Sequence, residues 1–123
     1  MLKFKQLASV AAAAVSLAFV AAPATATPTI GFGAAVANGT DWDVDVVVDG
    51  LAGDIVSAYD IDVAYDAVQL SFVNWAFSAN LGSPLADEIL DASVPGLVDI
   101  YSVSFLSDGD LLTLQGGGSV VLG

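Results

Sequence analysis

The sequence predicts an all-β fold, an antiparallel sandwich or jelly roll. Hydrophobic periodicity after residue 28 is mostly two residues, as in strands, rather than the 3.6 residues of a helix. Glycine and aspartate turn signals recur at short intervals, and no stretch is patterned for a helix of useful length. Several short strands joined by such turns are typical of two packed antiparallel sheets.

The first 26 residues have the pattern of a secretory signal peptide. Both basic residues of the chain, Lys3 and Lys5, precede an apolar run over 7–20, and Ala24 and Ala26 form a small-x-small cleavage site. The run is shorter than the ~20 residues that a transmembrane helix needs. We therefore expect a signal peptide over 1–26, a single domain over 27–123, and an exported protein of the extracellular space or cell envelope.

Removal of this leader would leave a strongly acidic domain. The full chain has a net charge of −12 from 2 basic and 14 acidic residues, and both lysines lie in the leader, so the remainder has −14. Phosphate backbones and anionic lipid surfaces repel such a domain. The composition therefore argues against a nucleic-acid partner, and membrane attachment would need a C-terminal anchor that these 123 residues do not include. The chain has no cysteine, so no disulfide stabilises it.

Four strands are expected in the first part of the domain. Residues 29–34 form a short strand, and Asn38-Gly39 marks a turn. Residues 41–48 predict a strand with aspartates on one face and Trp42, Val44 and Val46 on the buried face. Residues 55–65 alternate most clearly, with Asp60 and Asp62 on the outer face. Residues 70–77 predict a fourth strand, in which Trp75 is buried on a face shared with Ser71, Val73 and Phe77.

The second part begins with a long connection over 78–95, in which 84–90 could form one helical turn. Residues 98–105 resume the alternation. Ser107 or Asp108 could cap a helical turn that the glycines at 116–118 end. Residues 119–122 start another strand just before the chain stops, which predicts an incomplete, C-terminally truncated sandwich with an open apolar edge. The alternative is a short edge strand.

Two long segments and two short motifs between them carry a resemblance to a known family. They are 54–66 (DIVSAYDIDVAYD), followed by 70–72 (LSF) and 81–82 (LG), and 98–111 (VDIYSVSFLSDGDL). The chain resembles the cohesin-like β-sandwich modules of bacterial exported proteins with PEP-CTERM sorting tails. The resemblance implies a jelly-roll sandwich, further strands after Ser119, and a Pro-Glu-Pro tail with a membrane span. No dockerin-binding residue can be carried over, because no local motif matches one.

The residue types argue against most enzymes. The chain lacks histidine and cysteine and, after processing, lysine and arginine, so Ser-His-Asp catalysis has no base and phosphate binding has no cation. A glycosidase needs only two carboxylates, and Asp60 and Asp62 share a strand face. That face is expected to be solvent-exposed, whereas a catalytic acid needs a partly buried pocket. We therefore expect no enzymatic activity, and a polysaccharide hydrolase fragment is the function that the sequence favours least.

Calcium is the one possible cofactor. Aspartates at 41, 43 and 45 resemble the start of an EF-hand loop, but Val46 stands at the glycine position and no glutamate closes the loop. Loop sites at Asp49 and Asp54, or at Asp108 and Asp110, remain candidates. In the alternative interpretation these carboxylates cap turns and keep the surface soluble.

Two functions are compatible with these observations. The first is an exported, non-catalytic module for protein interaction or envelope structure, with an unknown protein partner. The alternative is a carbohydrate-binding module that holds a polysaccharide on an aromatic platform, for which the candidates are Trp42, Tyr59, Trp75 and Tyr101. Aromatic side chains on strands more often belong to the core.

Overall fold

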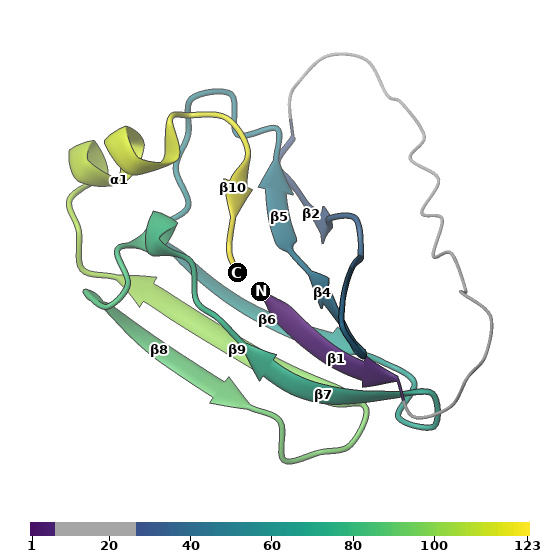
Figure 1. The fold of residues 1–123 in the computed structure, drawn as a ribbon. Helices are drawn as coiled ribbons and strands as arrows, with labels where there is room; N and C mark the ends of the chain where they lie inside the picture. Colours follow the sequence, from purple (N-terminus) through teal and green to yellow (C-terminus); the bar gives the residue numbers. More distant parts are fainter. Residues whose placement is uncertain (7–26) are drawn as a thin grey trace.

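The computed structural model describes residues 1–6 and 27–123, which form antiparallel β-strands with one short α-helix (Figure 1). The all-β prediction is confirmed. The strands are β1 (Leu2–Gln6), β2 (Thr29–Phe32), β3 (Val36–Asn38), β4 (Asp41–Val44), β5 (Val46–Asp49), β6 (Ala58–Ala64), β7 (Leu70–Trp75), β8 (Ala86–Asp91), β9 (Leu97–Ser104) and β10 (Val120–Val121). The helices are the 3₁₀ turn η1 (Ala79–Leu81) and α1 (Asp108–Gln115).

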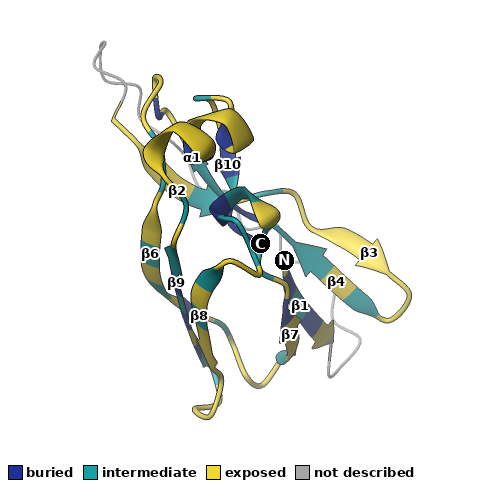
Figure 2. Cartoon of the chain, turned by 90° about the vertical axis from the view of Figure 1, so that its left-hand side faces the viewer, coloured by how far each residue is buried: buried dark blue, intermediate teal, exposed yellow. Residues whose placement is uncertain are grey.

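The strands are arranged in three sheets that make two layers. The sheet orders are β3-β4-β1-β7, β10-β5-β2 and β6-β9-β8. The sheet β6-β9-β8 lies on one side of the molecule, and β1, β4 and β7 lie on the other (Figure 2). This two-layer arrangement has the character of a β-sandwich, in which each layer buries one face against the other.

A single hydrophobic cluster fills the space between the layers. Edge-on ring contacts join the strands, with 5.3 Å between the ring centroids of Phe4 and Tyr65 and 6.0 Å between those of Phe4 and Phe72. Such geometry is favoured for aromatic pairs. The buried members of the cluster are Leu2, Phe4, Val46, Leu51, Val63, Trp75, Leu81, Val98, Ile100, Val120 and Leu122.

The N-terminal segment forms a central strand of this core. β1 pairs in antiparallel register with β4 on one side and with β7 on the other, and Leu2 and Phe4 are buried. Residues 1–6 are the basic part of the expected signal peptide, and no pattern in them predicts that they pair with the domain. The apolar run and the cleavage site of the expected leader lie outside the described residues.

The segment expected to be one strand over 41–48 is two strands with different partners. β4 pairs with β1 and β3, whereas β5 pairs with β2 and β10, and the change falls at Asp45. Trp42 stands opposite the buried Phe4, on the predicted face, but it stays 36% exposed. The β3–β4 hairpin projects to one side of the molecule (Figure 2), and Trp42 lies on this hairpin.

The predicted burial of Trp75 is confirmed, but the predicted face of its strand is wrong. Trp75 is opposite Leu2, and Phe72, three residues earlier, is opposite Phe4. A register irregularity between Lys3 and Phe4 accounts for this odd spacing. It turns Phe72 and Trp75 toward the core and leaves Val73 43% exposed.

The connection over 78–95 contains a strand that periodicity did not predict. The expected helical turn at 84–90 is wrong, because β8 occupies this stretch and pairs with β9 from Ala86 to Asp91. A short 3₁₀ turn, η1, lies earlier, with Ser78 as its N-cap. The β8 sequence lacks clear alternation, so its strand conformation follows from pairing with β9 rather than from intrinsic preference.

The C-terminal elements follow the predicted boundaries. Ser107 caps α1, its side chain accepting a hydrogen bond from the backbone N–H of Asp110, and Gly116 ends the helix with φ +66. A left-handed conformation at this position favours glycine. The helix is longer than the expected single turn. Among the described residues, no helix has the length and apolarity to cross a membrane.

Candidate binding groove

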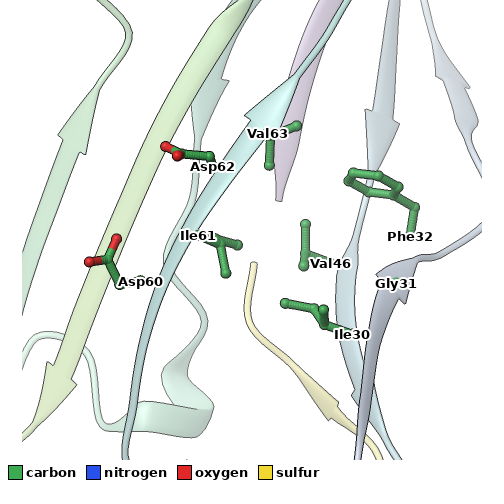
Figure 3. A pocket seen from close by; sticks show the side chains of 8 residues that line it. All are labelled: Ile30, Gly31, Phe32, Val46, Asp60, Ile61, Asp62 and Val63. Carbon is green, nitrogen blue, oxygen red and sulfur yellow. The ribbon is translucent and has the colours of Figure 1, made fainter.

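An apolar groove lies between the two layers, where β6 faces β2 and β5. It encloses about 400 Å³. Ile61 and Val63 of β6 point into it from one side and Ile30 of β2 and Val46 of β5 from the other, whereas Asp60 and Asp62 point away (Figure 3). The residues that line it are Ile30, Gly31, Phe32, Val46, Asp60, Ile61, Asp62 and Val63.

Two strand edges without a partner flank this groove. Within the described part of the chain, β6 pairs only with β9 and β2 pairs only with β5, so each ends its sheet. Ile30 is 51% exposed and Phe32 53% exposed, and a Cβ atom added at Gly31 would meet nothing within 4 Å. An exposed edge with apolar side chains is a template for pairing with another strand.

A second part of the groove adjoins the first at Ile30 and is lined partly by the loop that connects β5 to β6. This second part encloses about 520 Å³, shares Ile30 with the first, and is lined by Val56 and Tyr59 among others. Gln115 of α1 fixes the loop. Its side-chain amide donates to the carbonyls of Val56 at 2.7 Å and Asn80 at 3.0 Å, and its side-chain oxygen accepts from the Val56 N–H at 2.8 Å.

Tyr59 lines this second part and reaches the C-terminal segment. Its hydroxyl donates a long hydrogen bond, 3.4 Å, to the carbonyl of Leu122. Burial is the main cause that raises the pKa of Tyr59 to about 12, and the charge of Glu88 adds to it against the lowering effects of Trp75 and Ser102. The hydroxyl is therefore a neutral donor at physiological pH.

The groove itself was not predicted from the sequence. The sequence predicts a short strand over 29–34, of which β2 forms the first part, and the exposure of Ile30 and Phe32 could not be inferred from it. The feature of the sequence that could have indicated the groove is the alternation of apolar residues with glycines in this strand, because glycines leave room beside a strand. The face of β6 was predicted: Tyr59, Ile61 and Val63 lie toward the core, and Asp60 and Asp62 are exposed.

The calcium candidates lie at element ends. Asp49 ends β5 and accepts a hydrogen bond from the Ser119 hydroxyl, and Asp110 accepts one from the Ser107 hydroxyl at 2.7 Å. Asp108 begins α1, and Asp54 lies in the loop that lines the groove. No group of three or more acidic side chains in the described ranges is arranged to hold a metal ion. Calcium binding at these aspartates stays a prediction.

The four aromatic candidates do not form one platform. Trp75 is 7% exposed and packs edge-on against Phe77, with 6.0 Å between their ring centroids. Tyr59 is opposite Ser102 and Tyr101 is opposite Asp60, so the two tyrosines lie on opposite faces of their sheet. Trp42 lies on the projecting hairpin. A sugar that stacked on one of these rings would not reach the others.

The outer face of β6-β9-β8 carries a row of acidic residues. Asp62, Asp99 and Asp91 are directly opposite one another across the three strands, with Asp60 one pair away. Desolvation of its carboxyl and the negative charges of Asp60, Asp62 and Asp91 raise the pKa of Asp99. Asp91 differs, because hydrogen bonds from Ser93 lower its pKa.

Asp99→Asn is expected to stabilise the protein at neutral pH. A raised pKa means that protonated Asp99 favours the folded state below the ordinary value of 3.8, and that this contribution is lost as the pH rises through the folded-state pKa. Removing the charge should raise the melting temperature at pH 7 by a few degrees, on the order expected for like charges directly opposite in a sheet.

The gain should shrink toward zero at pH 3 and at high salt. Asp87→Asn is the matched control, since Asp87 lies on the same face but opposite Val103, and its gain should be smaller. Thermal melts of the three proteins by circular dichroism test this. Equal gains for the two variants would contradict a specific repulsion at Asp99.

Comparisons with known proteins return no relative: no family model matches the chain, and no curated protein or solved structure matches it.

Proposed function

We propose that this protein is exported and is a non-catalytic interaction module, which binds an extended segment of a partner polypeptide in the groove between β2 and β6. The observation that carries the proposal is the apolar groove flanked by two strand edges that lack partners among the described residues. A partner strand would satisfy backbone groups of an edge and place alternate side chains on Ile30 and Phe32.

The charge of the domain defines the partner further. Residues 27–123 carry 14 acidic and no basic residues, and Asp60 and Asp62 adjoin the groove on β6. A segment that alternates apolar and basic residues is complementary to this surface, and the attraction would speed association. Export follows from the leader pattern and gives the extracellular space or envelope as the place of binding.

We also propose that the domain is a cohesin-like jelly roll. The two-layer antiparallel arrangement supports this proposal. The two long segments that carry the resemblance, 54–66 and 98–111, also support it, because they contribute most of β6 and β9, which pair side by side in one sheet. A non-catalytic role is supported by the exposure of Asp60 and Asp62, the two carboxylates that share a strand face as a glycosidase pair would.

A strand-forming peptide tests the groove. The probe is a fluorescent heptapeptide of alternating lysine and valine, titrated against the full chain and followed by anisotropy. Ile30→Asp should weaken binding at least about tenfold, because Ile30 lines both parts of the groove and is exposed enough to be replaced without loss of the fold.

Val68→Asp is the matched control, since it makes the same change of charge at a site that is 83% exposed and outside the groove. A probe methylated on alternate backbone nitrogens should bind weakly, since it cannot pair with an edge. If Ile30→Asp binds the peptide as tightly as Val68→Asp, the attraction is only electrostatic and the groove is not the site. If a soluble glucan binds and the peptide does not, a carbohydrate-binding module replaces the proposed function.

A further inference from the structure

The strand β1 fills a position that the rest of the domain leaves open on two sides. β4 pairs with it from Val44 to Asp41, and β7 pairs with it from Trp75 to Leu70. No pairing joins β4 directly to β7 in the described residues. Without β1, both strands would present unpaired backbone groups to a gap one strand wide, which we call the β4–β7 slot.

The slot is shaped for alternate apolar side chains. Leu2 is 0% and Phe4 8% exposed, and both belong to the central cluster. The intervening residues differ: Lys5 is exposed, and the Lys3 ammonium lies 3.9 Å from the carboxylate of Asp43. An occupant therefore needs apolar residues two positions apart.

The slot also favours a cation. Oδ1 of Asp43 is buried and accepts no hydrogen bond from the described residues, while Oδ2 accepts one from Asn38 at 2.9 Å. The Lys3 ammonium is the only cation that an ion pair joins to Asp43 in the described part of the chain. A buried carboxylate oxygen without a donor is costly, so a positive charge between the two apolar positions is stabilising.

We propose that the β4–β7 slot is a strand-acceptor site, which after removal of the leader takes an extended segment of a separate polypeptide with an apolar-basic-apolar pattern. The proposal rests on the proposed export, because cleavage after Ala26 would remove the residues that fill the slot. It concerns a site distinct from the groove between β2 and β6, since none of the residues that line that groove belongs to β1, β4 or β7.

Charge selects the occupant. A second copy of residues 27–123 has no lysine or arginine, so no strand of it can place a basic side chain beside Asp43 between two apolar residues. A separate polypeptide with a basic residue can do so, and it would bind by the main-chain pairing that the structure already has for β1. The occupant is therefore a different protein rather than another copy of this one.

The experiment uses the protein as a secreting bacterial host processes it. Its intact mass is measured first, and a fluorescent hexapeptide with the sequence of residues 1–6 is then titrated into it. Loss of 1–26 and saturable binding of this peptide are expected. A peptide with aspartate in place of Phe4 should bind at least about 100-fold more weakly, since a charge replaces a buried ring.

A charge exchange tests the cation. A peptide with glutamate in place of Lys3 should bind about fivefold more weakly, as expected for a partly exposed ion pair. The protein variant Asp43→Lys should reverse this preference. A processed protein that is unfolded alone and gains strand signal in circular dichroism only with the unmodified peptide would also support the proposal.

Three outcomes would overturn the proposal. A mass that includes residues 1–6 means that the leader keeps the slot filled, and the proposed cleavage after Ala26 fails with it. A processed protein that is folded and ignores the hexapeptide leaves export intact but refutes the acceptor site. Processed protein that forms a dimer and no longer binds the peptide would show that a second copy is the occupant.

Discussion

Phe4→Ala should lower the free energy of unfolding of the full chain by about 3–5 kcal/mol, the usual cost of removing a buried phenylalanine. Phe4 is 8% exposed and contacts the rings of Tyr65 and Phe72, so its loss leaves a cavity between the layers. A chain of this size has a total stability of about 5–15 kcal/mol, so the variant is expected to be marginal.

Lys5→Ala is the control for Phe4→Ala, because Lys5 lies on the same strand with its side chain exposed, and its effect should stay within about 0.5 kcal/mol. Urea unfolding of the three full chains, followed by tryptophan fluorescence of the buried Trp75, measures both effects. Equal stability of Phe4→Ala and the unmodified chain would mean that the N-terminal segment does not pack into the core in solution.

Gln115→Leu should cost about 2–4 kcal/mol, although leucine matches glutamine closely in volume. The substitution removes three hydrogen bonds at once and leaves the N–H and C=O of Val56 and the C=O of Asn80 without their partner. Each partly buried backbone group left in this way costs about 1–3 kcal/mol, reduced where water can reach it. The loss falls on the loop that covers the second part of the groove.

Two measurements separate this effect from a general loss of helix stability. Thr113→Ala, on the exposed side of the same helix, should change stability by no more than about 0.5 kcal/mol. The amide of Val56 should exchange with solvent faster in Gln115→Leu than in the unmodified chain. Exchange of the β9 amides should change only as much as the global free energy of unfolding changes. Unchanged exchange at Val56 would contradict the role assigned to Gln115.

The alternation of residue types along the sequence predicted the strands that have one face on the core and the other in solvent. β6 alternates because Ile61 and Val63 face the core and Asp60 and Asp62 face solvent, and each residue type matches its side. The two ends of α1 could also be predicted from the sequence, because Ser107 and Gly116 act through contacts within the helix ends themselves.

Elements that depend on distant partners were missed. β8 is a strand because β9 pairs with it, and the face of β7 changes because a register irregularity opposite β1 shifts the spacing of Phe72 and Trp75. The groove was missed for the same reason, since the exposure of Ile30 depends on which strands lie beside β2. A sequence pattern gives the preference of a residue but not the identity of its neighbours.

The two ends of the described structure lie side by side, and the carbonyl of each terminal residue accepts a hydrogen bond from a different backbone amide. The N–H of Ala76 donates to the carbonyl of Met1 at 2.9 Å, and the N–H of Val46 donates to the carbonyl of Gly123 at 2.9 Å (Figure 1). In a nuclear magnetic resonance spectrum the hydrogen-exchange rates of the Ala76 and Val46 amides would report separately on the N-terminal and C-terminal ends. If β1 left the sheet, the Ala76 amide would lose its protection from exchange while the Val46 amide kept its own. A single exchange experiment would therefore distinguish local fraying of one end from global unfolding.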